Sequence, residues 1–416
     1  MDNPKFDFND VIFADLHLHS RFSRACSKDL TFENLVKWAK IKGLNLLGTG
    51  DFTHPLWFKE IQEKLTEKNG FYYYEDFPFL ITGEISLIYS KKAENNPRLG
   101  RRIHLVLLIP DIKTAEQINS YFDKKGRRDY DGRPIFNIDG EELVREMMKI
   151  SRDIEIIPAH IWTPWFGLFG SMSGFDSLKE CFGEETKNIH AIETGMSSDP
   201  EMNWRIRELK EKAIISFSDS HSFWPFRLGR EATIFRKVDS YKGIIEQIRN
   251  KTFIGTIETE PAYGKYHYDG HRNCNFSCSP EETKKLNGIC PVCHKPLTIG
   301  VDNRVEQLAE NPKGHKIENA KPFYKILPLQ EIIALAIGGS MNSKKAWTAY
   351  NYMIKEFGNE LNILLNTSKE ELLHKKIDEK LAELIIKNRH GKINVTPGYD
   401  GEYGKASIAE KQEKLF

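Results

Sequence analysis

The sequence lacks the long apolar runs of a membrane protein and has almost no net charge. Nowhere in its 416 residues do about 18 apolar residues follow one another, so we expect no membrane-spanning helix. The 60 Lys and Arg residues are balanced by 59 Asp and Glu residues, which leaves a formal charge of +1. A chain so near neutrality has no overall attraction for nucleic acid, although one part of its surface can still be basic.

Cysteine is scarce, and its distribution excludes a disulfide framework. Four of the six cysteines lie close together and two are isolated: Cys274, Cys278, Cys290 and Cys293, then Cys26 and Cys181. This usage is typical of a reducing compartment with one metal site. The N-terminal stretch MDNPKFDFND has neither the basic nor the apolar region of a signal peptide. The sequence therefore predicts a cytoplasmic protein without membrane association.

Short apolar runs alternate with amphipathic stretches along the first part of the chain. Strands are expected at VIFADLHLH, LNLLGTGD, PFLITGEISLIY, RRIHLVLLI, IEIIPAH, IHAIET and AIISFSDSH. Helices are expected between some of them, including LTFENLVKWAKIKG with Thr31 as N-cap and Gly43 as stop. Such alternation predicts parallel βα units, and seven or eight strands indicate an α/β barrel.

The character of the sequence changes near Ala262, where Tyr, Gly and His become frequent and the cysteine group follows. Helical stripes then continue toward the C-terminus. The length allows two or three domains. We predict a metal-dependent barrel over 1–262, a zinc-binding domain over 263–315 and a helical domain with an extended tail over 316–416.

Metal-type ligands stand at or near the ends of nearly all the predicted strands. They are His17, His19, Asp51, Glu84, His104, His160, Glu193, Asp219 and His221. In H-x-H and D-x-H both ligands share one face, because alternate strand residues point the same way. One buried histidine is usually structural, but so many unpaired buried charges would be costly. The set suits two or three divalent ions: zinc, or manganese, iron or magnesium.

DLHLHS, GTGDFTH, the glutamate of GEIS, the isolated His104 and His160, and SDSH resemble the polymerase-and-histidinol-phosphatase (PHP) family. The resemblance implies a distorted (β/α)7 barrel whose trinuclear metal centre hydrolyses phosphoesters. The implied ligands are His17, His19, Glu84, His104, His160, Asp219 and His221. Glu84 is the bridging candidate, and Asp219, Glu84 and His221 are the expected catalytic residues, with Asp219 orienting or deprotonating the attacking water.

The chain departs from the PHP pattern at two places. Many members have T-D-H where this chain has T-G-D, so Asp51 is expected to replace a histidine ligand. In SRFSRACS the further ligand that often follows H-x-H is missing, which puts the third ion in question. Glu193 matches no ligand and is expected to support one from behind.

The spacing Cys274-x3-Cys278 and Cys290-x2-Cys293 predicts a four-cysteine structural zinc site. His271 is the alternative ligand if Cys278 points away. A loop this short buries too little to fold unaided, so the metal is expected to fold it. Zinc ribbons either contact nucleic acid or staple domains together, and the spacing does not decide between the two.

Two aromatic loops directly follow the strands that end in His160 and His221. Their residues are Trp162, Trp165, Phe166 and Phe169, then Phe223, Trp224 and Phe226. Seven aromatics at one barrel mouth predict a surface for stacking bases, and Arg227 is included in the expected DNA-binding set. The alternative is that these side chains only pack the barrel rim.

The order of barrel, cysteine module and helical tail resembles the endonuclease Q family along nearly the whole chain. The resemblance includes PAHIWTPWFGLFGS, ETGMSSDPEMNWR, GKYHYDGHRNC and PGYDGEYG. It implies a DNA repair endonuclease that cuts the phosphodiester 5′ to deaminated bases (uracil, hypoxanthine, xanthine) and to abasic sites. Damaged DNA is the implied partner. For the terminal YGKASIAEKQEKLF we hypothesise a contact with a sliding clamp.

Two other functions fit parts of the sequence. A PHP phosphatase of a small phosphomonoester would use the same metal centre, but it would not need the zinc module and the helical tail. A nucleic-acid-binding protein with an inactive PHP barrel would need those parts, but it would not need a nearly complete ligand set.

Overall fold

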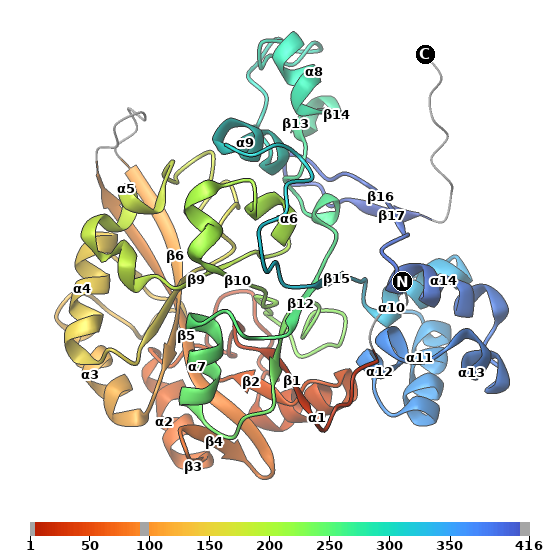
Figure 1. Ribbon diagram of the computed structural model, residues 1–416, viewed down its shortest axis with the longest axis horizontal. Helices are drawn as coiled ribbons and strands as arrows, with labels where there is room; N and C mark the ends of the chain where they lie inside the picture. Colours follow the sequence, from red (N-terminus) through yellow and green to blue (C-terminus); the bar gives the residue numbers. More distant parts are fainter. Residues whose placement is uncertain (1–4, 92–99, 408–416) are drawn as a thin grey trace.

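The computed structural model describes residues 5–91 and 100–407, and its centre is a mixed sheet with helices around it (Figure 1). The sheet has eleven strands. The main path runs β15-β12-β11-β1-β2-β5-β4-β3, while β6 and β7 pair with β5, and β8 pairs with β6. The bounds are β1 Val11–Asp15, β2 Leu46–Gly48, β3 Thr66–Lys68, β4 Phe71–Tyr74, β5 Phe77–Ser90, β6 Gly100–Ile109, β7 Ile135–Phe136, β8 Glu155–Pro158, β11 Ala232–Arg236, β12 Gly255–Glu258 and β15 Phe323–Lys325.

A second, parallel pair of strands, β9 Ala191–Glu193 and β10 Ala213–Ile215, lies beside this sheet. The helices of this part are α1 Phe32–Lys42, α2 Pro55–Lys64, α3 Ile112–Asp123, α4 Gly140–Ile150, α5 Leu178–Phe182, α6 Pro200–Asn203 and α7 Tyr241–Arg249. Short 3₁₀ helices occur at η1 Gly183–Asn188, η2 Arg207–Glu211, η3 Pro261–Tyr263 and η4 Arg272–Cys274. The α/β fold class predicted from the sequence is confirmed.

The first helix begins and ends where the sequence predicts. The Thr31 hydroxyl accepts the backbone N–H of Asn34, and Gly43 ends the helix with a φ of 100° that favours glycine. Leu35 and Ala39 lie buried on its inner face. Both side chains belong to the main hydrophobic core, so this face packs the helix against the barrel.

The direction of strand pairing explains how the barrel is distorted. Parallel pairing, as predicted from the βα alternation, holds for β1–β2, β2–β5 and β9–β10. In contrast, β5–β6, β6–β8, β1–β11 and β11–β12 are antiparallel. No helix separates β5 from β6 among the described residues, so these long strands pair directly with each other.

Single hydrogen bonds between the segments that follow the strands complete the barrel. The backbone N–H of Ile161 donates to Glu193 O at 3.0 Å, and that of His19 donates to Ser220 O at 2.9 Å. The Ser216 N–H donates to the Thr233 hydroxyl at 3.1 Å. These bonds bring the segments after β1, β8, β9 and β10 to one end of the barrel.

The cysteine module forms a small unit on the barrel. It contains β13 Asp269–His271, β14 Phe276–Cys278, α8 Pro280–Lys285 and α9 Val301–Leu308. Its own apolar cluster contains Cys278, Cys290 and Leu297. The module is attached through α9, where Arg304 donates to Phe169 O at 3.0 Å and also contacts Asp176.

The C-terminal part is a group of helices followed by a hairpin. The helices are α10 Leu329–Ile337, α11 Lys344–Phe357, α12 Glu360–Leu365, α13 Lys369–His374 and α14 Glu379–Arg389, and the hairpin is β16 Asn394–Thr396 with β17 Lys405–Ser407. The hairpin returns to the segment before the cysteine module, where Gly404 N–H donates to Tyr263 O. We keep the division at 262/263 and 315/316 as a proposal; β15 lies after the second boundary but pairs with β12 of the barrel.

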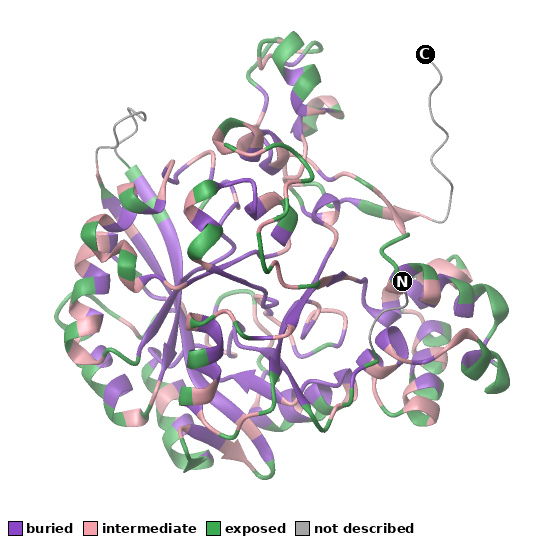
Figure 2. Cartoon of the chain, viewed as in Figure 1, coloured by how far each residue is buried: buried purple, intermediate pink, exposed green. Residues whose placement is uncertain are grey.

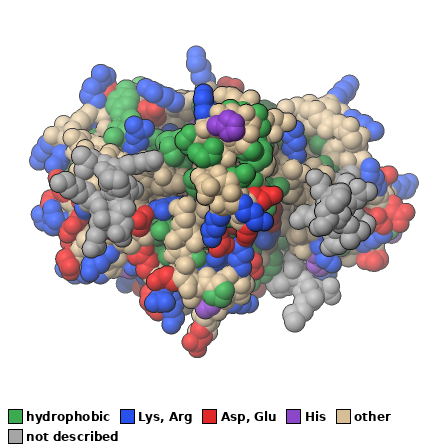
Figure 3. Space-filling view, turned by 90° about the horizontal axis from the view of Figure 1, so that it is seen from above, with side chains coloured by type: hydrophobic (Ala, Val, Ile, Leu, Met, Phe, Trp, Pro, Cys, Tyr) green, Lys and Arg blue, Asp and Glu red, His purple; other side chains and the backbone are tan. Residues whose placement is uncertain are grey.

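Burial follows the layers: most barrel strands are buried, although β3 is exposed, and the outer helix faces are exposed (Figure 2). Seen from above, Lys and Arg side chains are spread around the margin together with Asp and Glu, while apolar side chains gather near the middle (Figure 3). In the described part of the chain no helix has both the length and the apolar character needed to cross a membrane.

Candidate metal centre

The two histidines that follow β1 point their Nε2 atoms at the same carboxylates. His19 Nε2 lies 3.1 Å from Asp219 Oδ1 and 3.3 Å from Glu84 Oε2. His17 Nε2 lies 3.6 Å from the same two oxygens. The ligand atoms of these four residues lie within 4.8 Å of one another. This first group is a potential site for one metal ion.

Glu84 also belongs to a second group, with His104 and His160. Its Oε1 lies 2.8 Å from His104 Nδ1 and 3.2 Å from His160 Nε2, whereas its Oε2 faces the first group. In the β5–β6 register His104 faces Ser86, so its side chain shares a face with that of Glu84. One carboxylate thus serves two groups, the arrangement expected of a bridging ligand.

A carboxylate behind each histidine of the H-x-H pair orients its ring. Glu193 Oε1 lies 2.8 Å from His17 Nδ1, and Asp51 Oδ1 lies 3.0 Å from His19 Nδ1. A carboxylate on Nδ1 fixes the tautomer that presents Nε2 to a metal. Glu193 therefore lies behind a histidine of the candidate metal site, the position expected from the sequence.

The position of Asp51 differs from the ligand role expected from the sequence. Its second oxygen accepts hydrogen bonds from the Ser20 backbone N–H at 2.6 Å and from the Ser20 and Ser23 hydroxyls at 2.7 and 2.8 Å. With these donors and His19 around it, Asp51 lies outside both groups. The serines of SRFSRACS therefore hold Asp51 behind His19.

His221 also lies outside the two groups. Its ring packs against that of His19 at 4.3 Å between centroids, and its Nδ1 lies 3.0 Å from the backbone oxygen of Asp219. Asp219 itself has a φ of 49°, and His160 has a φ of 31°. Left-handed backbone at non-glycine residues is strained and is often found at functional sites.

The protonation behaviour of the site suits cations. Burial lowers the pKa of His104 to about 4, which leaves its imidazole neutral and able to bind a metal. Burial opposes ionisation of Glu84, but the hydrogen bond from His104, together with Arg133 and His17, outweighs burial and holds the pKa of Glu84 well below the usual range. The buried Nε2 of His17 has no hydrogen-bond partner in the structure. An orphaned imidazole nitrogen beside two ionised carboxylates fits a divalent metal ion.

Sequence reasoning missed Arg133, whose Nη1 donates to Glu84 Oε2 at 3.0 Å. The residue lies in a turn between the predicted elements, where no periodicity marks it. The turn lies close to the centre. A Cβ on Gly132 would lie 2.1 Å from Asp51 Oδ2, so this close approach requires glycine.

The two aromatic loops divide into buried and accessible side chains. Trp162 and Phe169 are completely buried and Phe223 nearly so, which removes them from any surface that stacks bases. Trp224 is 39% exposed but packs against Trp38 and Trp347. Phe226 and Arg227 are half-buried, with the guanidinium 5.9 Å from the ring centroid.

Trp165 and Phe166 line a cavity of about 370 Å³ that opens onto the metal centre. The ligands Asp219, His104 and His160 form part of its wall. Three other lining residues, which were not predicted, come from outside the barrel: Lys265, Tyr266 and Tyr403. The cavity therefore joins the metal ligands to an aromatic wall built by three parts of the chain.

Comparison with solved structures places the chain in a family. The crystal structure of the lesion-specific endonuclease PfuEndoQ from Pyrococcus furiosus has a TM-score of 0.85 and 30% identity, covering 96% of both chains. This chain belongs to the endonuclease Q family. An endonuclease Q complex with a 27-mer duplex carrying an abasic lesion at the active site also has a TM-score of 0.85 and 30% identity, covering 98% of this chain and 100% of that one.

Two further relatives of this endonuclease Q family member are named as uncharacterised proteins. Residues 328–392 match the family model of the MJ0043 C-terminal domain. Protein MJ0043 of Methanocaldococcus jannaschii is 35% identical over 303 residues, covering 70% of this chain but only 36% of that protein. YqxK of Bacillus subtilis strain 168 is 25% identical over 419 residues, covering 95% of this chain and 98% of YqxK. The chain thus spans about a third of the first of these relatives and nearly all of the second.

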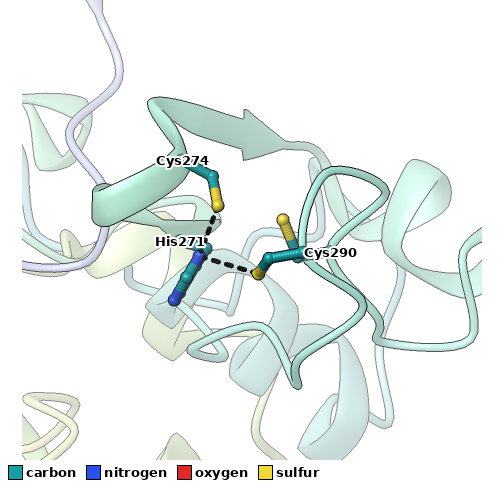
Figure 4. Close-up of side chains that lie close together, drawn as sticks. His271, Cys274 and Cys290 are labelled. Carbon is teal, nitrogen blue, oxygen red and sulfur yellow. Dashed lines mark hydrogen bonds between the residues drawn. The ribbon is translucent and has the colours of Figure 1, made fainter.

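The cysteine module of this endonuclease Q family member gathers His271, Cys274, Cys290 and Cys293. The first three are labelled in Figure 4. His271 Nδ1 lies 3.0 Å from Cys274 Sγ and 3.4 Å from Cys293 Sγ. The expected fourth cysteine, Cys278, lies outside this group, and its Sγ is 3.2 Å from the Thr283 hydroxyl. In the pairing of β13 with β14, Cys278 lies opposite Asp269, whereas Phe276 lies opposite His271. Cys278 is therefore displaced by two residues along the strand from His271.

Proposed function

We propose that this protein is a metal-dependent DNA repair endonuclease. It hydrolyses the phosphodiester 5′ to deaminated bases (uracil, hypoxanthine and xanthine) and to abasic sites. The observation that carries the proposal is the sharing of Glu84 between two ligand groups, whose members Asp219, His104 and His160 line a cavity of about 370 Å³. Membership of the endonuclease Q family and the abasic-site complex of a relative support it.

The residues of the two groups would hold two divalent ions, with Glu84 between them. When bound, such ions polarise a phosphoryl oxygen and supply a nucleophilic water at neutral pH. Asp219 is the residue of the first group that lines the cavity, and its pKa lies well below the usual range because His19, His17 and His221 outweigh the effect of burial. An ionised Asp219 can accept a hydrogen bond from the attacking water and so orient it.

The cavity suits a nucleotide turned out of the duplex. An enzyme that inspects one base must extrude it, and extrusion is easiest at mispaired or missing bases. Trp165 and Tyr266 lie edge to face, 5.4 Å apart between ring centroids, and offer apolar surface to a base. Deamination replaces an amino donor with a keto acceptor, and Lys265, 4.5 Å above the Tyr403 ring, places a donor at this cavity.

Damaged DNA is the partner that follows from this function. The hypothesised sliding-clamp contact concerns the end of the chain, and its residues 408–416 lie outside the part that the structure describes.

The direct test offers the metal-loaded protein several phosphoesters. These are labelled duplexes with one uracil, hypoxanthine, xanthine or abasic site, an undamaged duplex, and p-nitrophenyl phosphate. We expect a single cut 5′ to each lesion and none in the undamaged duplex, with loss of cutting in chelator. Hydrolysis of p-nitrophenyl phosphate alone would instead indicate a small-molecule phosphatase, and binding without cutting would indicate an inactive barrel.

Alanine variants of two similarly exposed tryptophans test whether the cavity binds a base. Trp165→Ala should lower incision roughly tenfold or more, because one stacked base contributes about 1–3 kcal/mol. Trp224→Ala should instead lower the unfolding temperature, because Trp224 packs between Trp38 and Trp347. A 2-aminopurine beside the lesion reports extrusion as a fluorescence rise on binding. No rise, with a Trp165→Ala protein that is merely less stable, would contradict the cavity assignment.

A further inference from the structure

One cationic side chain lies among the metal ligands without a metal role. Arg133 donates from Nη1 to Glu84 Oε2, the oxygen that also faces the first ligand group. Its side chain is 27% exposed, whereas Glu84 is completely buried. The guanidinium therefore reaches solvent, whereas the Glu84 carboxylate that it contacts does not.

The backbone that carries Arg133 is fixed, but the side chain is lightly tied. Arg133 N–H donates to Asp131 Oδ1 at 3.1 Å, and the adjacent Pro134 O accepts from Ser86 N–H at 3.0 Å. For the guanidinium, Glu84 is the one hydrogen-bond acceptor found among the described residues. In contrast, Arg304 donates to two backbone oxygens and to Asp176. Most of the five N–H donors of Arg133 thus remain available.

Because Arg133 shares Glu84 Oε2 with the first ligand group, its guanidinium can also bind a second anion. A ligand oxygen of Glu84 attracts any cation in the first group, so the guanidinium and a metal ion would compete for it. A guanidinium that gives up part of this contact retains a planar fork of donors, which matches phosphate oxygens. Since the turn holds its backbone in place, little reorganisation is needed to present that fork to a bound phosphate.

We propose that Arg133 is a catalytic residue that binds the phosphate being cleaved and stabilises the charge developing on its oxygens. The proposal rests on the proposed phosphodiester hydrolysis. The alternative is that Arg133 only neutralises Glu84, and the two roles predict different behaviour of metal content and rate.

The test compares Arg133→Gln and Arg133→Lys with Arg24→Gln in the full-length, metal-loaded protein. Arg24 is a suitable control because it is 78% exposed and pairs with Asp131 of the same turn. We expect Arg133→Gln to lower the single-turnover cleavage rate of a uracil duplex about 10²–10³-fold, the usual effect of removing one transition-state donor. The cleavage rate of Arg133→Lys should lie between those of the wild type and Arg133→Gln, since an ammonium keeps the charge but lacks the planar fork of donors. Arg24→Gln should cut within about threefold of the wild type.

Two readouts separate catalysis from structure. Metal content and unfolding temperature should be unchanged in Arg133→Gln, and added guanidinium should partly restore cleavage by Arg133→Ala. Inorganic phosphate should bind the metal-loaded Arg133→Gln protein about tenfold or more weakly than the wild type. A near wild-type rate, loss of metal from Arg133→Gln, or equal phosphate binding would overturn the proposal. If the wild type cuts no lesion duplex, the proposed function fails, while the phosphate-binding result still decides the role of Arg133.

Discussion

At the scale of single residues, two side chains of the same type have different roles at the metal centre because their surroundings differ. Asp51 and Asp219 are both aspartates after a strand, and both have left-handed backbone. Three donors from Ser20 and Ser23 enclose one oxygen of Asp51, whereas Asp219 faces the cavity. The same side chain thus orients a histidine in one place and lines the cavity in the other.

We expect Asp219→Asn to remove most strand cleavage while the fold and DNA binding are retained. The amide keeps the size of the carboxylate but loses the negative charge that attracts a metal and orients the attacking water. With saturating metal, the single-turnover rate should fall at least ~100-fold. Fluorescence anisotropy should show duplex affinity within about threefold of the wild type. Cleavage at a near wild-type rate would contradict the assignment.

A second residue-scale prediction concerns two glutamates buried behind the centre. The Ser216 hydroxyl lies 3.3 Å from Glu231 Oε2 and 3.1 Å from Glu258 Oε2. Burial raises the pKa of Glu231 from 4.5 to about 8 despite the nearby Arg230. Since the folded pKa lies above the unfolded one, the contribution to stability is complete below 4.5 and is lost as pH rises through about 8.

We expect Glu231→Gln to flatten this pH dependence, because glutamine resembles the protonated acid. In chelator, the denaturant midpoint of the wild type should fall between about pH 5 and about pH 9, and that of the variant should fall less. Glu184→Gln, at an exposed glutamate, should keep the wild-type slope. Equal slopes for Glu231→Gln and the wild type would show that this residue does not hold the proton.

At the scale of elements, strand ends were the most predictable feature. Alternation in H-x-H brings His17 and His19 into one group with Asp219, whereas His221 of D-x-H lies outside that group. The predicted strands also contained Glu84 and His104, but their antiparallel pairing, which brings them together, differs from the parallel units expected. Loops were less predictable, because they have no periodicity. Nothing in the sequence distinguishes exposed Trp165 from Trp162, which packs on Phe169 at 4.9 Å.

The cysteine module gives an element-scale prediction. Cys290→Ser with Cys293→Ser should release about one zinc equivalent and unfold the region around β13, β14 and α8, because the metal holds this small cluster together. The barrel should keep its fold and its own metals. His271→Ala should also lose zinc, while Cys278→Ser should retain it, as its thiol contacts Thr283 instead. Elemental analysis measures the zinc content of each variant. Zinc loss from Cys278→Ser but not from His271→Ala would instead support the four-cysteine site predicted from the sequence.

At the scale of the whole molecule, the barrel and the C-terminal helices share a buried interface that the sequence did not reveal. Trp38 of α1 packs with Trp224 and with Trp347 of α11, at centroid distances of 5.2 and 5.8 Å. Beside them, Lys42 Nζ donates to Glu360 at 2.7 Å and to Pro225 O at 2.8 Å. The two ionic partners lie 318 positions apart in the chain, so local patterns carry no information on their pairing.

This ion pair is almost completely removed from solvent, with exposures of 2% for Lys42 and 0% for Glu360. Glu360 also accepts from the Tyr350 hydroxyl at 2.8 Å and from Leu329 N–H at 3.0 Å. Pro225 belongs to the loop that follows Asp219 and His221. The pair therefore connects three parts: α1, the loop after the metal ligands and the helical domain.

We expect Lys42→Met to destabilise the protein by about 3–5 kcal/mol, because it leaves the charge of Glu360 buried without its partner. The double variant Lys42→Met/Glu360→Leu should recover much of this loss, since no uncompensated charge remains. Lys40→Met removes an exposed pair with Asp76 from the same helix and should cost about 0–1 kcal/mol. Denaturant unfolding followed by tryptophan fluorescence measures all three. If Lys42→Met is no more destabilising than Lys40→Met, the buried pair does not hold the helical domain to the barrel, and the tryptophan cluster must do so without it.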